Sequence, residues 1–157
     1  MTKGFKLDSE VVKIQLEAET KEEVFIEMAN MLQNAGYVKE SYLNGILKRE
    51  EVFPTGLPTG DIGVAIPHTD VEHVNMPMVA AATLNRPVQF GIMGGNIEDT
   101  IDVKVVFMLA MKDGNAQLQV LQNIMGIIQD EELLNEISSA QDEEVLLTLL
   151  EDKININ

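Results

Sequence analysis

The chain has 157 residues and no cysteine, and its 26 acidic against 11 basic side chains give a formal net charge of −15 at pH 7. A negative field of this size repels phosphate backbones and anionic lipid, so we expect no nucleic acid among the partners and no insertion into a membrane. No disulfide can form, Met1–Phe5 lack the apolar core of a signal peptide, and no apolar run approaches bilayer length, so we expect a cytoplasmic protein with a single domain over 1–157.

The first part of the chain predicts one strand and two helices. Val12–Leu16 alternates apolar and polar residues, which is typical of a strand with one buried face. Thr20 and Glu23 form a capping box, and apolar residues then recur at helical spacing until Gly36. A second apolar stripe predicts another helix over 39–51.

The next segments predict a loop, a strand and a candidate functional residue. Two prolines and two glycines make 53–61 a loop. Ile62–Ile66 is typical of a buried strand, and it ends at Pro67, which lacks the N–H that would continue strand pairing. His68 therefore begins a loop just past a strand, where open α/β sheets usually place chemistry, and histidine changes charge near neutral pH.

Two further strands are expected after His73. Met78–Leu84 is an apolar run of strand length, and we expect Asn85–Pro87 to turn it into the brief segment Val88–Phe90. Ile101–Met111 is dense in Val, Ile and Phe and gives the strongest strand signal in the chain.

Three helices are expected to complete the chain. The first is capped within Asp113–Asn115, the second spans 130–137, and the third spans 142–150 and is opened by Ser139. Strands interleaved with helices predict an α/β fold, a three-layer sandwich in which a mixed sheet is covered by helices on both faces.

Candidate site residues come from three segments. If the strands ending at Ile66 and Met111 run parallel, His68 and the start of the next helix, with Gln117 in its first turn, meet at one sheet edge. Helix starts attract anions, and the planar fork of Arg49 binds phosphoryl oxygens in pairs. The simpler alternatives are that Arg49 only pairs with the last carbonyls of its helix and that Gln117 is a helix-surface residue.

Other chemistries have less support in the sequence. His68 and His73 are five residues apart, so only a loop would let both bind one metal together with Asp70 or Glu72. The glycine-rich segment 91–95 lacks the Lys-Ser/Thr ending of a phosphate loop, and no Gly-x-Ser-x-Gly elbow is present. We therefore expect no metal and no cofactor.

Three segments carry a resemblance to a known family. They are Lys48–Leu57, Ile62–His68 and the helix Gln117–Leu121 after Asp113–Asn115. These segments resemble the IIA phosphocarrier domain of bacterial sugar phosphotransferase systems in its fructose/mannitol class, and the likeness extends from Phe5 to Leu150. The chain looks most like galactitol-type members, which share the Phe-Pro-Thr-Gly loop and a second histidine five residues after the first, here His73.

The resemblance implies a phosphotransferase component with a phosphohistidine intermediate. His68 would accept a phosphoryl group from the carrier protein HPr and pass it to a cysteine of a cognate IIB domain, and Arg49 would contact the phosphoryl group. Mannitol and fructose members carry a second histidine where this chain has Gln117, which could orient the His68 ring but supplies no charge. His73 is a further candidate, and the likeness points to galactitol as the sugar.

Two alternatives remain open at this point. A regulatory module of the nitrogen-system type would keep the phosphorylated histidine but act by binding other proteins. A structural or metal-binding domain would carry no phosphate on His68. If the chain is a phosphocarrier, an apolar rim around His68 would exclude water, protect the N–P bond and form a docking surface. Its candidate members are Leu57, Val71, Val74, Met76 and Met78, which are equally candidates for the core.

Overall fold

The computed structural model describes residues 6–60, 62–96 and 98–154, in which one mixed sheet of five strands lies between two layers of helices. The strands are β1 (Val12–Leu16), β2 (Gly56–Leu57), β3 (Gly63–Ala65), β4 (Met78–Gly91) and β5 (Thr100–Ala110). The helices are α1 (Lys21–Asn34), α2 (Tyr42–Val52), α3 (Gly114–Gln129), α4 (Glu131–Ser138) and α5 (Glu143–Ile154), with 3-10 turns η1 (Ser9–Val11) and η2 (Val71–His73).

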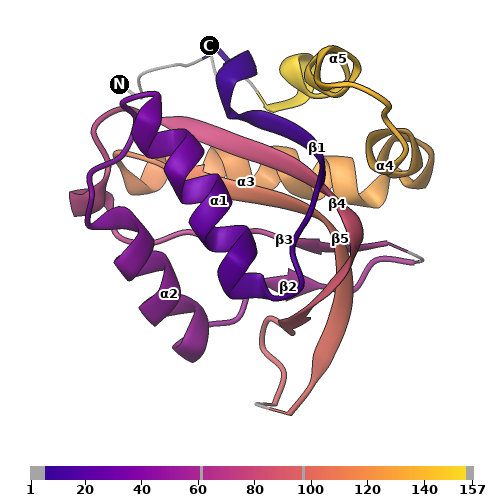
Figure 1. The fold of residues 1–157 in the computed structure, drawn as a ribbon, viewed down its shortest axis with the longest axis horizontal. Coiled ribbons are helices and arrows are strands. Elements are labelled where there is room, and N and C mark those ends of the chain that lie inside the picture. The colour runs from indigo at the N-terminus through magenta and orange to yellow at the C-terminus, as the bar shows by residue number, and fades with distance from the viewer. Residues whose placement is uncertain (1–5, 61, 97, 155–157) are drawn as a thin grey trace.

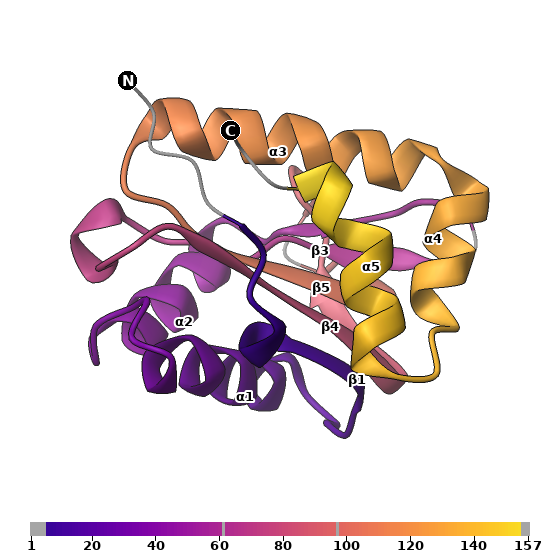
Figure 2. The same cartoon turned by 90° about the horizontal axis from the view of Figure 1, so that it is seen from above.

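The sheet is mixed, and helices cover both of its faces. The strand order is β1-β4-β5-β3-β2, in which β4 and β5 are antiparallel, β1 is parallel to β4, β3 is parallel to β5 and β2 is antiparallel to β3. Helices α1 and α2 cover one face of the sheet, and α3, α4 and α5 lie on the other (Figures 1 and 2). Because both faces are covered, the central strands are buried along most of their length, as an α/β sandwich requires. The predicted fold class is confirmed.

The predicted helix starts are confirmed where the cap is local. The Thr20 hydroxyl accepts a hydrogen bond from the Glu23 N–H. In return the Glu23 carboxylate accepts from the Thr20 hydroxyl and from the N–H of Glu19, one residue before the N-cap, so Thr20 and Glu23 pair as the capping box predicts. Asp113 caps α3 by accepting from the Ala116 N–H at 2.8 Å. The Asp113 cap therefore fixes the first turn of α3 just after the end of β5.

Two predicted breaks are wrong. Asn85–Pro87 does not turn the chain, because β4 continues to Gly91. The pairing register with β5 shifts between Thr83 and Val88, and a proline, which has no N–H, is tolerated in such an irregularity. The predicted loop 53–61 contains β2, and its last position, Asp61, lies outside the described residues.

The predicted start of the last helix is also wrong. Ser139 does not open α5, because its hydroxyl donates back to the carbonyl of Asn135 at the end of α4. Asp142 is the capping residue, since its carboxylate accepts from the Val145 N–H at 2.8 Å. The start of α5 therefore lies four residues after Ser139.

The parallel pairing of β3 with β5 brings the candidate residues to one edge of the sheet. Beyond β3, the Pro67 carbonyl accepts a hydrogen bond from the Leu109 N–H at 2.9 Å, and His68 forms an isolated parallel bridge with Leu109. The Leu109 carbonyl in turn accepts from the buried Tyr42 hydroxyl at 2.6 Å. One residue of β5 therefore fixes both the His68 segment and the helix that carries Arg49.

Candidate functional site

His68 is partly buried, and its ring orientation is set by its own backbone. Its Nδ1 lies 2.9 Å from the Ile66 carbonyl oxygen. Since a carbonyl only accepts, Nδ1 carries the proton, and Nε2 of the neutral ring keeps its lone pair. Burial lowers the pKa of His68 below its usual value, the hydrogen bond to Ile66 opposes this, and the nearby charge of Arg49 lowers it further. The arrangement favours a neutral imidazole with a free Nε2.

A cavity of about 410 Å³ joins His68 to segments far apart in the sequence. It is lined by residues from the last turn of α2, from the segment after β3 together with the start of η2, and from the start of α3. The lining residues are Arg49, His68, Thr69, Asp70, Val71, Glu72, Gly114 and Gln117. The structure thus brings together His68, Arg49 and Gln117.

Arg49 enters this cavity from the last turn of α2. Its Nη1 lies 4.0 Å from Oδ1 of Asp70, a side chain that is 70% exposed. Its Cζ lies 5.0 Å from the centre of the Phe53 ring, and within the described residues its buried Nε has no hydrogen-bond partner. A guanidinium with so few polar contacts is available to bind an oxyanion through two parallel N–H donors.

The start of α3 forms the opposite wall of the cavity. Gly114 and Gln117 line it, and both belong to the first turn of the helix. The N–H groups of a first turn lie at the positive end of the helix dipole. Asp113 accepts from two of them, the Ala116 N–H through its carboxylate and the Gln117 N–H through its carbonyl, which leaves those of Gly114 and Asn115 without an intrahelical acceptor. This wall therefore favours an anion beside His68.

Sequence reasoning missed a buried carboxylate next to Arg49. Glu50 is only 4% exposed and accepts two hydrogen bonds of 2.8 Å from Thr55, one from the backbone N–H and one from the hydroxyl. Burial raises the pKa of Glu50, and both hydrogen bonds from Thr55 oppose the rise. The pair closes the loop after α2. The sequence signals the burial of Glu50 only through its position, which lies on the apolar face of a helix end that is otherwise charged.

His73 is anchored by contacts with the start of α2. Its Nδ1 is 2.8 Å from the Ser41 hydroxyl, and its backbone carbonyl accepts from the Lys39 N–H. The ring also packs against Gly45, where a Cβ atom would come within 3.1 Å of it. His73 is not among the described residues that line the cavity. It ties η2 to the start of α2.

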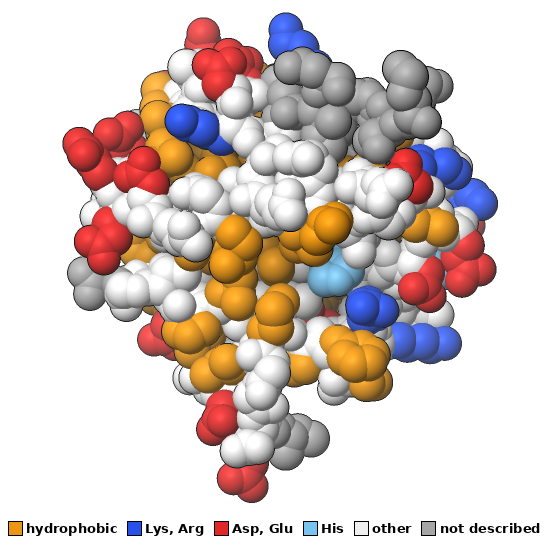
Figure 3. Space-filling model, turned by 180° about the vertical axis from the view of Figure 1, so that it is seen from behind, with side chains coloured by type: hydrophobic (Ala, Val, Ile, Leu, Met, Phe, Trp, Pro, Cys, Tyr) orange, Lys and Arg blue, Asp and Glu red, His pale blue; other side chains and the backbone are white. Residues whose placement is uncertain are grey.

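The predicted apolar rim is partly wrong. Val74 and Met78 are 1% and 3% exposed, because Val74 bridges to Val38 and Met78 begins β4 inside the sheet. Val71 and Met76 are exposed as expected, and so are two residues the pattern did not single out, Phe53 at 58% and Leu118 at 57%. In the space-filling view a histidine lies at the surface beside cationic and hydrophobic side chains (Figure 3).

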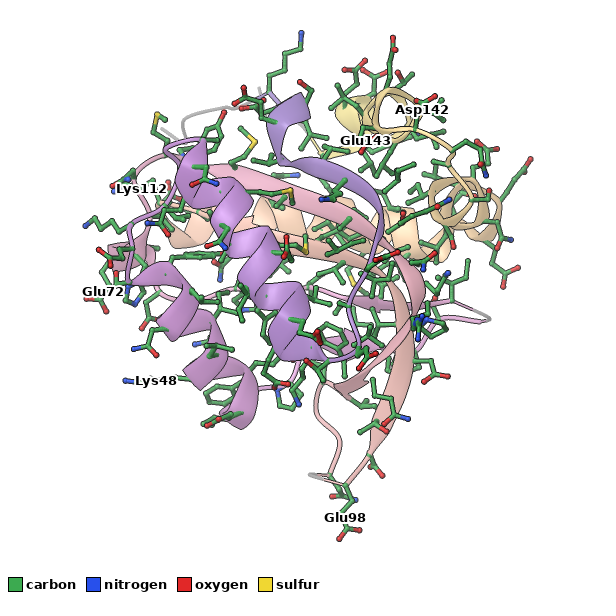
Figure 4. The ribbon with its side chains drawn as sticks, viewed as in Figure 1. Lys48, Glu72, Glu98, Lys112, Asp142 and Glu143 are labelled. Atoms are coloured by element: carbon green, nitrogen blue, oxygen red, sulfur yellow. The ribbon has the colours of Figure 1, made fainter. Side chains whose placement is uncertain are left out.

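Charged side chains of both signs lie on the side of the molecule that carries the cavity. Lys48 of α2, Glu72 of η2 and Lys112 before α3 all lie along one edge of the stick view (Figure 4). Lys112 is anchored there, since its Nζ donates to the Val74 carbonyl at 3.1 Å. Cations on this edge offset part of the net negative charge around the cavity. Over the described ranges, none of the helices has the length and apolar character needed to cross a bilayer.

The chain is similar to IIA components of sugar phosphotransferase systems over nearly its whole length. A family model described as "Phosphoenolpyruvate-dependent sugar phosphotransferase system, EIIA 2" matches residues 6–153. The mannitol-specific phosphotransferase enzyme IIA component of Bacillus subtilis is 30% identical over 152 residues, which are 93% of this chain and 96% of that protein. A solved complex of enzyme IIA and phosphorylated enzyme IIB for mannitol from Escherichia coli matches with a TM-score of 0.75 and 25% identity, over 92% of this chain and 96% of the matched chain.

Other relatives are much longer than this chain. The fructose-specific EIIABC component of Bacillus subtilis is 27% identical over 148 residues, which are 92% of this chain but 22% of that protein. The chain therefore spans about a fifth of the length of this multidomain relative.

Proposed function

Because the chain belongs to the EIIA 2 family of the phosphoenolpyruvate-dependent sugar phosphotransferase system, in its fructose/mannitol class, we propose that His68 is its phosphoryl acceptor. The observation that carries this proposal is the hydrogen bond from Nδ1 to the Ile66 carbonyl, which leaves Nε2 as the nucleophile inside a cavity shared with Arg49. The chain would act as a phosphocarrier, with a phosphohistidine as its intermediate.

The proposed transfer moves one phosphoryl group between two imidazole rings. The Nε2 lone pair of His68 attacks phosphorus on the phosphohistidine of an HPr-type carrier, the new N–P bond forms, and the old one breaks with its electron pair returning to the carrier's ring. A neutral His68 is required, which agrees with the lowered pKa. No metal or cofactor takes part.

Arg49 and the start of α3 would stabilise the charge on the transferring group. In phosphoryl transfer, positioning and electrostatic stabilisation supply most of the catalysis. The guanidinium would bind two phosphoryl oxygens from one side, and the first-turn N–H groups of α3 would face the other. Gln117 would hydrogen-bond an oxygen or the ring, whereas His73 would act only through the anchoring of η2.

A complex formed by a relative supports a IIB partner. The mannitol IIA domain of Escherichia coli forms a complex with phosphorylated IIB, and we propose that this chain passes its phosphoryl group to a cysteine of a cognate IIB and receives it from HPr. We further propose that residues 1–157 form one domain that works in the cytoplasm. Galactitol stays a proposal for the sugar, since the relatives described above are named for mannitol and fructose.

Transfer of radioactive phosphoryl groups from a phosphorylated HPr-type carrier tests the proposal. Wild-type protein should take up acid-labile label, and His68→Gln should take up none. His73→Gln is the matched control, since it removes the other histidine and should still be labelled. Label on the His68→Gln protein would refute the assignment. Labelled protein that passes nothing to any IIB would instead favour the regulatory alternative.

A further inference from the structure

We propose that Phe53 is a positioning residue for Arg49, whose guanidinium its aromatic ring holds at the cavity shared with His68. The inference rests on the function proposed above and adds a residue outside the cavity lining to the phosphoryl-binding apparatus. It starts from one contact, the 5.0 Å between Cζ of Arg49 and the centre of the Phe53 ring. This distance lies inside the roughly 6 Å range over which a cation is attracted to the face of an aromatic ring.

The local sequence fixes the ring in this place. Phe53 is the C-cap of α2, and its N–H donates to the Arg49 carbonyl at 2.7 Å. Pro54 disfavours helical geometry for the residue before it, and Phe53 accordingly leaves the helix with φ −127° and ψ 80°. Two residues on, Thr55 is clamped by the buried Glu50. The backbone is therefore held on both sides of Phe53, and its ring folds back over Arg49.

Arg49 has little else to hold it. Among the residues that the structure describes, it forms one ion pair, with Asp70, which is 4.0 Å long and involves a carboxylate that is 70% exposed, so this pair contributes little in water. In the described part of the chain its buried Nε has no hydrogen-bond partner. A ring face attracts the cation without occupying its N–H donors, so those donors stay free for phosphoryl oxygens. The contact with Phe53 thus orders the side chain without competing with the ligand.

Phe53 has no comparable role in the core. It is 58% exposed, whereas Phe25, Phe90 and Phe107 are each at most 1% exposed. Removing its ring should therefore leave folding stability nearly unchanged. The competing explanation is that an exposed phenylalanine beside the cavity simply contacts the partner protein. The two explanations differ in whether the effect of Phe53 requires Arg49.

A double-mutant cycle separates them. We measure the rate of label transfer from the phosphorylated HPr-type carrier to wild type, Phe53→Leu, Arg49→Ala and the double variant. Leucine keeps the apolar character but has no ring, and we expect it to slow transfer by roughly threefold to tenfold. Phe53→Tyr restores the ring face and should stay within about twofold of wild type. In the Arg49→Ala background Phe53→Leu should have no further effect.

Two transfer results would overturn the inference. One is a Phe53→Leu variant that transfers as fast as wild type. The other is a Phe53→Leu effect of equal size with and without Arg49, which would assign Phe53 to partner contact. A second measurement needs no partner: the Nε–H resonance of Arg49 should show a ring-current shift that Phe53→Leu removes and Phe53→Tyr retains. An unlabelled wild type would count against the proposed function alone, and an Arg49 resonance unmoved by Phe53→Leu would count against the role of Phe53.

Discussion

Glu50 and Thr55 are joined by two hydrogen bonds of 2.8 Å, and this pair closes the loop that follows the helix carrying Arg49. Both side chains are almost completely buried, at 4% and 2% exposed. A buried carboxylate that loses a donor has no water to replace it. The pair therefore links the stability of the loop to the geometry of the candidate site.

Thr55→Val should destabilise the protein. Valine has nearly the shape of threonine but leaves Oε1 of Glu50 without its donor, so we expect a loss of about 1–3 kcal/mol in the free energy of unfolding. Urea denaturation at pH 7 measures this loss. Thr59→Val is the control. Its partly buried hydroxyl donates to the Ile62 carbonyl, a neutral acceptor, so its loss should lower the free energy of unfolding by less. An unchanged midpoint for Thr55→Val would show that the clamp contributes nothing.

The stability contributed by Glu50 should depend on pH in the direction opposite to most carboxylates. Burial raises its pKa in the folded protein above the value of about 4.5 in the unfolded chain. Protonation then favours the folded state, so the contribution is fully present below pH 4.5 and is lost as pH rises through the folded pKa. The free energy of unfolding of wild type relative to Glu50→Gln should accordingly fall as the pH rises above about 4.5. A relative stability that rises over this range would contradict the burial argument.

Arg49→Ala should slow phosphoryl transfer and raise the pKa of His68. Loss of a charged donor pair to a phosphoryl group corresponds to roughly a tenfold to hundredfold lower rate. The charge of Arg49 helps to lower the pKa of His68, although burial is the larger cause, so the pKa should move only part of the way back. NMR titration of the His68 imidazole protons in wild type and variant measures this shift. A folded variant with an unchanged transfer rate would make Arg49 only a charge at a helix end.

Asp70→Asn should increase the fraction of protein that carries the phosphoryl group at equilibrium with its carrier. Asp70 lines the cavity, and its carboxylate lies 4.0 Å from Arg49, so it repels an incoming phosphoryl group and competes for the guanidinium. We expect a change of about twofold to fivefold, smaller at high salt because the carboxylate is exposed. Quantitative labelling at two ionic strengths measures it. A lower phosphorylated fraction would mean that Asp70 instead orients Arg49 productively.

Local signals in the sequence were sufficient for much of the fold. The caps of α1 and α3 depend on residues three apart, and Thr20 with Glu23 and Asp113 with Ala116 act as the pattern predicted. The turn at Asn85–Pro87 failed because pairing with β5 overrides the local preference of proline. Pro67 marked the end of β3 correctly within two residues.

Contacts between distant segments limited the prediction of the site. The loop position of His68 followed from Pro67, but the burial of Glu50 depends on Thr55 folding back onto α2. The placement of the His73 ring depends on Ser41 and Gly45, which lie about thirty residues earlier in the chain. No periodicity in the sequence encodes these contacts. The support of Arg49 by Phe53 is more local, since a proline directly after an aromatic residue at a helix end favours it.

The most direct test of the central claim is to identify the nitrogen that carries phosphorus. Protein labelled with ¹⁵N in its histidines is phosphorylated by the HPr-type carrier and followed by NMR, which distinguishes the four ring nitrogens of His68 and His73. Because Nδ1 of His68 donates to the Ile66 carbonyl, we predict phosphorus on Nε2 of His68 alone. A phosphoryl group on Nδ1 of His68, or on either nitrogen of His73, would contradict the account.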